Sequence, residues 1–272
     1  MDTRETARKV AIVTGASSGI GEALAWQLAK TGYHVVLAAR NEEKLRRMAK
    51  ELVTFGCGAW VVKTDVSVEE DCRRLVHETI EQFGRIDVLI NNAGVSMRAL
   101  FKDVTLDVLR KLMDVNFWGT VYCTKYALPY LLSNKGSLVG ISSIAGRKGL
   151  PGRSGYAASK FAMEGFMQTI RIEHLPDGLH VMVVCPGFTS SNIRFTALNA
   201  AGEAQAESPR DESKMMSPEA VAYEIVEALQ QRKRDLVLTR LGKLTVWLNK
   251  FFPVWADRQV FKVMAKEPKS PI

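Results

Sequence analysis

The chain has 272 residues, of which 47% are hydrophobic and 24% charged, and its formal net charge is +8 at neutral pH. This composition is typical of a soluble globular protein with an ample core. No run reaches the roughly 18 apolar residues that a membrane-spanning helix needs, and the N-terminal segment shows no apolar signal sequence. We therefore expect a cytoplasmic protein whose four scattered cysteines stay reduced and bind no metal.

The positive charge is concentrated toward the C-terminus. From residue 232 onward, ten Lys or Arg residues accompany three acidic residues, so this stretch holds +7 of the net +8. The rest of the chain is close to neutral. This distribution argues against nucleic-acid binding by the protein as a whole.

Seven apolar runs alternate along the chain with six candidate helices. Several runs are apolar without alternation, which is typical of strands buried on both faces of a parallel sheet. The alternation predicts a single-domain, Rossmann-type, doubly wound seven-stranded parallel sheet with helices on both faces. The expected strands are 9–15, 33–39, 59–65, 86–94, 136–142, 180–187 and 235–239. The expected helices are 18–31, 41–55, 68–83, 105–133, 155–175 and 217–233.

These elements fill residues 1–240, so one catalytic domain is favoured over two. Ser67 and Ser217 are expected to cap helices, and Gly84 to end one. The polar connection over residues 188–216 is too long for an idle loop and is expected to cover the substrate as a lid. Residues 241–272 form an amphipathic extension, expected as one helical piece followed by a frayed end.

The first expected strand runs directly into the glycine-rich stretch "TGASSGIG". At a strand–helix junction, the free N–H groups of the helix start can bind a pyrophosphate. The stretch lacks the lysine of a P-loop, which excludes that class of nucleotidase. A merely tight turn is the alternative to a phosphate-binding loop. The expected cofactor contacts are Gly15, Ser17, Ser18, Gly19, Ile20 and Gly21.

The end of the second expected strand bears on the choice of dinucleotide. NAD-binding sites place an acidic residue here for the ribose 2′-hydroxyl. This chain instead has Ala38 and Ala39 followed by Arg40, whose guanidinium suits a 2′-phosphate. NADP(H) is therefore favoured over NAD(H). The alternative interpretation of Arg40 is a surface arginine at a strand end with no role in cofactor binding.

Four further motifs follow, each at the carboxyl end of an expected strand or just beyond it. They are "NNAG" (91–94), "ISSIAG" (141–146), "YAASK" (156–160) and "CPG" (185–187). Together with the glycine-rich loop, they make the chain resemble the short-chain dehydrogenase/reductase family from residue 9 to about 190 and again near residue 239. The resemblance implies a nicotinamide-dependent oxidoreductase that assembles as a homodimer or homotetramer through the helices expected at 105–133 and 155–175.

Tyr156 and Lys160 lie four residues apart and so share one face of a helix. A nearby ammonium is expected to lower the phenol pKa from about 10, making Tyr156 a general acid or base. In the family, the matching lysine also holds the nicotinamide ribose. Ser143 is expected to donate a hydrogen bond to the substrate oxygen. The family's spacing selects Ser143, and Ser142 is interpreted as structural.

Further roles follow only from the resemblance. Asn116 matches an asparagine that holds a water in a proton relay to the lysine, with a capping or kinking role as the alternative. Thr189 matches a residue that binds the nicotinamide carboxamide. The chain departs here from the family's PGxxxT, so Ser190, Ser191 or Asn192 could share that role. The remaining expected cofactor contacts are Asp65, Val66, Asn92, Ala93, Gly94, Pro186 and Gly187.

The sequence thus predicts an NADP(H)-dependent carbonyl reductase or alcohol dehydrogenase. Its small-molecule substrate is expected to be a moderately apolar ketone or secondary alcohol, with Ile193, Phe195 and Leu198 as apolar walls. The alternatives are an NAD(H)-dependent alcohol dehydrogenase and a catalytically idle dinucleotide-binding regulator or scaffold. The basic extension over 241–272 has three interpretations: docking on the sheet or a second subunit, peripheral membrane contact, or binding of an acidic carrier or acyl-phosphate partner.

Overall fold

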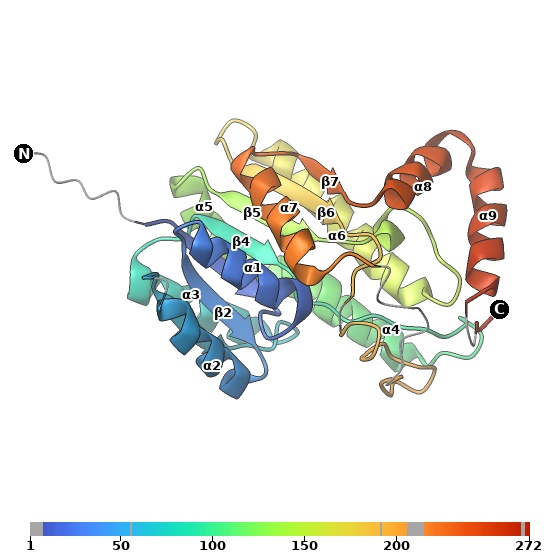
Figure 1. Ribbon diagram of the computed structural model, residues 1–272, viewed down its shortest axis with the longest axis horizontal. Helices are drawn as coiled ribbons and strands as arrows, with labels where there is room; N and C mark the ends of the chain where they lie inside the picture. Colours follow the sequence, from blue (N-terminus) through green and yellow to red (C-terminus); the bar gives the residue numbers. More distant parts are fainter. Residues whose placement is uncertain (1–7, 55, 191, 206–214, 268–269) are drawn as a thin grey trace, which may run out of the picture.

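Seven parallel strands form one sheet in the order β3-β2-β1-β4-β5-β6-β7 (Figure 1). The computed structural model describes residues 8–54, 56–190, 192–205, 215–267 and 270–272. The strand order reverses between β1 and β4, and such a switch point is where doubly wound sheets bind their ligands. The strands are β1 Val10–Thr14, β2 His34–Ala39, β3 Ala59–Lys63, β4 Val88–Asn91, β5 Ser137–Ile141, β6 His180–Cys185 and β7 Asp235–Val237. The fold predicted from the sequence is confirmed.

Helices cover both faces of the sheet, and this explains the continuously apolar strands. On β1, Ala11 and Val13 face a core shared with α1, α2 and α7, whereas Val10 and Ile12 face a core shared with α3, α5 and α6. Alternate residues of one strand therefore enter opposite cores. The helices of the two layers are α1 Gly19–Lys30, α2 Glu42–Val53, α3 Glu69–Phe83, α5 Gly119–Ser133, α6 Ser154–Glu173 and α7 Pro218–Gln230.

The helix expected over residues 105–133 is interrupted. It consists of α4 (Leu106–Met113), a π-helical turn η1 (Asp114–Trp118) and α5. A π turn inserts one extra residue per turn and re-aims the side chains within it, often at functional sites. Asn116 lies in this turn and is fully buried.

The predicted helix boundaries hold at some sites and fail at others. Ser217 caps α7 through a 3.2 Å hydrogen bond from the Ala220 N–H, as expected. Gly84 ends α3 with a φ of +70°, also as expected. The prediction for Ser67 is wrong, because its hydroxyl donates to Asp65 Oδ1 at 2.6 Å and Val68 precedes α3 instead.

The segment expected as a lid is anchored at its ends and in its middle. The Ser190 N–H donates to the Met216 carbonyl at 3.0 Å, which joins the two ends. The Leu198 N–H donates to the Ser96 carbonyl at 2.9 Å, and the Leu198 carbonyl accepts from the Arg98 N–H at 2.8 Å. Residues 191 and 206–214 of this segment lie outside the described residues.

The C-terminal extension forms two helices where the sequence predicted one, and of the end that follows them residues 268 and 269 lie outside the described residues. The two helices are α8 (Arg240–Phe251) and α9 (Pro253–Ala265). Pro253 opens α9, where its missing N–H costs nothing. Both helices lie at one end of the molecule, with α9 at its edge (Figure 1). Among the described helices, none has the length and apolar character to cross a bilayer.

Candidate active site

The glycine-rich loop connects β1 to α1 and packs against the segment after β4. Gly15 and Gly19 have φ values of +65° and +56°, a region that other residues rarely adopt. A Cβ on Gly15 would lie 2.9 Å from the Cα of Ala93. The amide of Asn92 donates to the Thr14 carbonyl at 2.9 Å. The structure therefore brings "TGASSGIG" and "NNAG" together at the switch point.

The start of α1 fits a pyrophosphate. Ser18 is the N-cap of α1, yet its side chain makes no capping hydrogen bond, so its hydroxyl is not committed to the helix. The helix start supplies N–H donors and a positive dipole end, and the side-chain-free glycines let an anion approach the backbone. Ser17 and Ile20 are half-buried beside it.

Arg40 and Asp65 follow neighbouring strands but have different surroundings. Arg40 directly follows β2, is exposed, and has no ion pair with any residue that the structure describes. Asp65 follows β3, and its Oδ1 accepts hydrogen bonds from the Ser67 N–H at 3.0 Å and the Ser67 hydroxyl at 2.6 Å. Part of the Asp65 carboxylate is thus used in the local turn, while Val66 is buried against Gly119.

Ser143 and Tyr156 meet beyond the end of β5. Ser143 precedes the short 3₁₀ turn η2 (Ile144–Gly146), and its hydroxyl accepts a 3.1 Å hydrogen bond from the Ala145 N–H. Tyr156 lies in the first turn of α6 and is buried. Burial raises the pKa of Tyr156, while a hydrogen bond with Ser143 and the positive charge of Arg153 lower it in part.

Lys160 is buried one helical turn after Tyr156. Its Nζ donates to the carbonyl of Ile141, the last residue of β5, at 2.8 Å. Burial lowers the pKa of Lys160 to about 8, against the opposing effects of Glu164 and Cys185. The expected lowering of the Tyr156 pKa by Lys160 is wrong for this structure: the net shift is upward, because burial dominates.

Asn116 connects the segment after β4 to α6. Its Nδ2 donates to the Val95 carbonyl and to the Ser159 hydroxyl, both at 2.9 Å, and its Oδ1 accepts from the Val95 N–H at 2.8 Å. The side chain thus fixes the local backbone. A Cβ on Gly94 would lie 3.1 Å from Asn116 Oδ1 and 3.6 Å from Lys160 Nζ, so these groups converge on one backbone segment.

Glu164 is a buried residue of this region that the sequence analysis did not single out. Its Oε1 accepts a 2.6 Å hydrogen bond from the Ser142 hydroxyl, and its carboxylate forms an ion pair with Arg147. Ser142 therefore points away from Ser143, as expected for a structural serine. The spacing of four residues between Lys160 and Glu164 was the available signal for a shared helix face.

The segment after β6 supplies the last expected contacts. Pro186 and Gly187 turn the chain, and Gly187 packs so closely on Thr239 that a Cβ would not fit. Thr189 is buried, with its hydroxyl 3.4 Å from the Gly187 carbonyl. Ser191, one of the alternatives to Thr189, lies outside the described residues.

An apolar cluster adjoins the phenol of Tyr156. Leu198 from the lid segment belongs to it, as expected for an apolar wall, together with Met97 and Leu112. Phe195 is exposed and Ile193 half-buried, and neither belongs to the cluster. Of the three predicted wall residues, only Leu198 belongs to the buried cluster that contains Tyr156.

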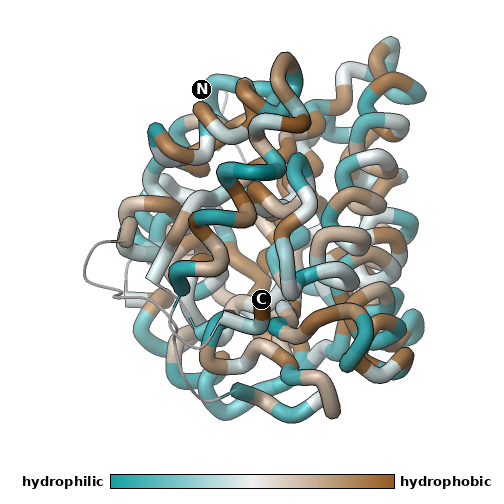
Figure 2. Tube along the Cα trace, turned by 90° about the vertical axis from the view of Figure 1, so that its right-hand side faces the viewer, coloured by the Kyte–Doolittle hydropathy of each residue, from teal (hydrophilic) through white to brown (hydrophobic). Residues whose placement is uncertain are grey.

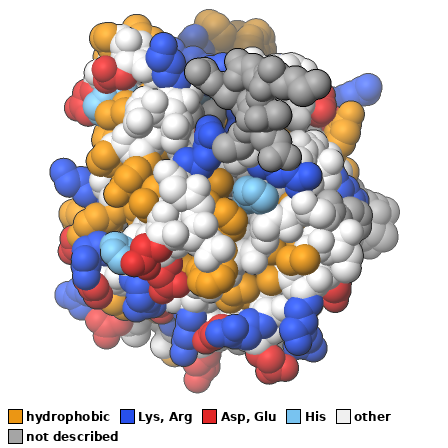
Figure 3. All heavy atoms as spheres, turned by 90° about the vertical axis from the view of Figure 1, so that its left-hand side faces the viewer, with side chains coloured by type: hydrophobic (Ala, Val, Ile, Leu, Met, Phe, Trp, Pro, Cys, Tyr) orange, Lys and Arg blue, Asp and Glu red, His pale blue; other side chains and the backbone are white. Residues whose placement is uncertain are grey.

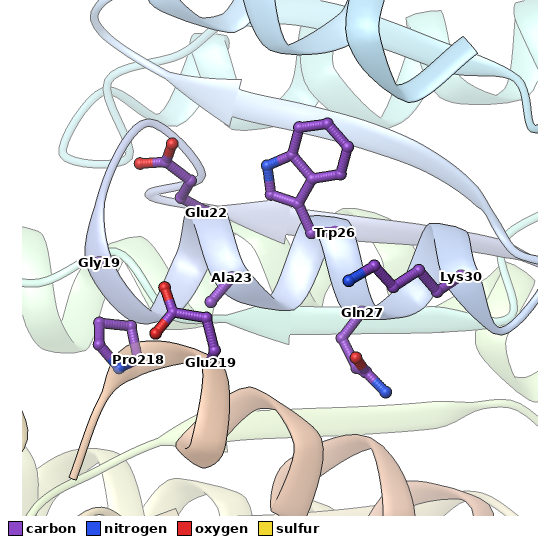
Figure 4. A pocket seen from close by; sticks show the side chains of 8 residues that line it. All are labelled: Gly19, Glu22, Ala23, Trp26, Gln27, Lys30, Pro218 and Glu219. Carbon is purple, nitrogen blue, oxygen red and sulfur yellow. The ribbon is translucent and has the colours of Figure 1, made fainter. Parts of the chain in front are cut away.

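A separate pocket of about 340 Å³ lies between α1 and α7 (Figure 4). Its lining residues come from α1 and from the start of α7, and Gly19 connects it to the glycine-rich loop. Ser143, Tyr156 and Lys160 do not line it, so it is distinct from the candidate catalytic residues. The lining residues are Gly19, Glu22, Ala23, Trp26, Gln27, Lys30, Pro218 and Glu219.

Comparisons with known proteins agree with this geometry. The sequence model of the short chain dehydrogenase family matches residues 9–200. The 11-beta-hydroxysteroid dehydrogenase A of Sesamum indicum is 37% identical over 98% of this chain and 79% of its own length. The 11-beta-hydroxysteroid dehydrogenase-like 4A of Arabidopsis thaliana is 46% identical over 66% of this chain and 60% of its own length.

A solved structure also matches most of the fold. It is an alcohol dehydrogenase from the archaeon Thermococcus sibiricus, complexed with 5-hydroxy-NADP. The two structures superpose with a TM-score of 0.74 at 27% identity, over 85% of this chain and 96% of that one. The protein therefore belongs to the short-chain dehydrogenase/reductase family of oxidoreductases, which bind a nicotinamide dinucleotide on a Rossmann fold.

Proposed function

We propose that this protein is an NADP(H)-dependent carbonyl reductase or alcohol dehydrogenase in which Tyr156 is the general acid and base. The observation that carries the proposal is the convergence of Ser143, Tyr156 and Lys160 beyond β5, beside Gly94. These groups lie at the same edge of the sheet as the glycine-rich loop.

The chain's own residues would hold the cofactor along this edge. The glycine-rich loop and the start of α1 fit the pyrophosphate, and exposed Arg40 fits a 2′-phosphate. Asp65 and Val66 would contact the adenine, and Asn92 to Gly94 the adenosine ribose. Lys160 would hold the nicotinamide ribose, and Thr189 the carboxamide. When bound, the reduced nicotinamide supplies a hydride ion to the carbonyl carbon.

The remaining steps fall to Ser143 and Tyr156. In reduction, the Ser143 hydroxyl donates to the carbonyl oxygen and stabilises the charge that develops there. The Tyr156 phenol then transfers its proton to that oxygen, which completes the alcohol and leaves a phenolate. In oxidation, the phenolate removes the alcohol proton. Asn116, which bonds Val95 and Ser159, holds the backbone beside Lys160 in place.

The surroundings of Tyr156 favour an apolar substrate. Met97, Leu112 and Leu198 form a buried apolar cluster with it. A moderately apolar ketone or secondary alcohol fits this cluster. The plant relatives are named 11-beta-hydroxysteroid dehydrogenase A and 11-beta-hydroxysteroid dehydrogenase-like 4A, and these names are consistent with that class.

We propose assembly as a homodimer or homotetramer through α5 and α6. Trp118 at the end of η1 and Tyr130 on α5 are exposed, as are Phe161 and Ile172 on α6. Large apolar side chains gathered on neighbouring helices are typical of subunit interfaces. The molar mass in solution, measured by light scattering, tests this assembly.

The enzymatic proposal is tested by NADPH oxidation with a panel of ketones. Wild-type protein is expected to reduce apolar ketones, and Tyr156→Phe is expected to lose a factor of about 10² to 10⁴ in kcat. The matched control is Tyr223→Phe, at an exposed position of α7, and it is expected to retain full activity. Tight NADPH binding without turnover of any ketone would instead favour the idle regulator or scaffold.

A further inference from the structure

The last two helices form a hairpin that contacts the body of the protein through ion pairs and hydrogen bonds, and Ala256 and Met264 are its buried apolar residues. The Lys148 Nζ donates to Asn249 Oδ1 at 2.7 Å and forms an ion pair with Asp257. Glu267, after α9, forms an ion pair with Arg98 at 3.7 Å. Gly242 is the close apolar contact, resting on Ile144 of η2.

The large apolar side chains of this hairpin point away from the body. Trp247 is 53% exposed and Phe251 54%, which is the reverse of what docking on the sheet requires. These side chains therefore do not contribute to docking of the extension on its own subunit. Figure 2 views this end, where hydrophobic and hydrophilic segments alternate along the tube. The other exposed apolar residues are Leu241, Leu244, Phe252, Val254, Trp255, Phe261 and Val263.

The same surface is strongly cationic. Residues 240–267 contain six Lys or Arg and two acidic residues, and both acidic residues pair with cations of the body. None of the six cations forms an ion pair with a residue that the structure describes. They are Arg240, Lys243, Lys250, Arg258, Lys262 and Lys266. The opposite end of the molecule, in contrast, intersperses acidic and basic side chains (Figure 3).

We propose that the α8–α9 hairpin binds the surface of a membrane rich in anionic phospholipids. Trp and Phe side chains are suited to the interfacial layer of a bilayer, and each Lys or Arg near an anionic surface adds attraction. The charge also argues against a second copy as the occupant. A two-fold contact through this surface would place six cations against the same six cations, while both acidic residues of the hairpin, Asp257 and Glu267, already pair with cations of the body.

The test is co-sedimentation of the full chain with two kinds of vesicles. One contains phosphatidylcholine alone, and the other equal parts of phosphatidylcholine and phosphatidylserine. Wild-type protein is expected to sediment with the anionic vesicles and to be released as the salt concentration rises. Equal sedimentation with both vesicles, or with neither, would overturn the proposal.

Two variants separate the apolar from the electrostatic contribution, each with a matched control. Trp247→Ala is expected to weaken binding, while Trp60→Ala on the distant edge strand β3 is not. Lys243→Glu with Lys250→Glu is expected to reduce the affinity at least about tenfold. The control pair Lys9→Glu with Lys50→Glu changes the net charge equally and is expected to have a smaller effect.

The ketone-reductase assay without lipid serves as the folding check, because none of these residues belongs to the candidate active site. If Trp247→Ala lowers the oligomer mass while the wild type ignores both vesicles, the surface is a contact between subunits and the membrane proposal fails. Loss of lipid binding with unchanged mass and activity supports it.

Discussion

Lys160 and Glu164 lie one turn apart on α6, and each side chain is almost completely buried, at 3% exposure. The negative charge of Glu164 raises the pKa of Lys160 and so favours its charged form, against the effect of burial. Glu164 is also held by Ser142 and Arg147, so it connects the end of β5 to the helix that carries Tyr156. The charge of Lys160 therefore depends on a residue outside the family motif.

Glu164→Gln is expected to move the alkaline limb of the activity profile to lower pH. The Lys160 pKa is about 8, and Glu164 raises it, so removing that negative charge lowers it further. Lys160 is an ammonium below this pKa and loses its charge above it. The measurement is kcat/KM for ketone reduction against pH. Glu224→Gln on exposed α7 is the control, and an alkaline limb that stays in place in Glu164→Gln would contradict the role of Glu164.

Arg40→Asp is expected to shift cofactor preference from NADPH toward NADH. The change removes the cation suited to a 2′-phosphate and supplies an acceptor for a ribose 2′-hydroxyl. The ratio of kcat/KM for the two cofactors should change by about 10-fold to 100-fold, as expected for loss of a charge-assisted contact. Lys50→Asp, on nearby α2, should leave the ratio unchanged. An unaltered ratio in Arg40→Asp would place the 2′-phosphate elsewhere.

Asn116→Ala is expected to destabilise the protein more than Asn134→Ala does. The Asn116 amide is fully buried and makes three hydrogen bonds, whereas Asn134 makes one side-chain bond, to the Ile86 carbonyl at 3.0 Å. Unsatisfied buried groups cost about 1–3 kcal/mol each. Urea denaturation should show a loss of at least about 2 kcal/mol for Asn116→Ala and about 1 kcal/mol for Asn134→Ala. Equal losses would argue against a specific role of Asn116.

Gly15→Ala and Gly165→Ala are expected to have opposite effects. An alanine at Gly15 meets both a left-handed backbone and the Cα of Ala93, so cofactor binding and stability should fall. Gly165 lies within α6 with nothing within 4 Å of a new Cβ, so alanine there should stabilise the helix by up to about 1 kcal/mol. Thermal unfolding with and without NADPH measures both effects. A Gly15→Ala variant with unchanged stability and cofactor binding would contradict the prediction that the backbone at this position must approach Ala93 closely.

Most of the fold follows from periodicity. The strands of the parallel sheet are recognisable because alternate residues enter two cores, which leaves strands such as β1 apolar throughout. The π turn around Asn116 gave no such signal, because its residues are compatible with an ordinary helix. The second helix of the extension was missed because Pro253 reads equally as a break and as a helix start.

The sequence by itself determined the parallel sheet, the glycine-rich turn between its first strand and helix, and the grouping of Ser143, Tyr156 and Lys160. Each depends on local spacing, and parallel strands bring their carboxyl ends to one edge whatever the packing details. Only the tertiary structure decided which charges act on those groups. Burial raises the pKa of Tyr156, and Glu164 rather than a motif residue supports the charge of Lys160. The tertiary structure also decided that the apolar face of α8 points outward. Both results depend on burial and on electrostatic coupling, which are set by distances between segments that are remote in the chain.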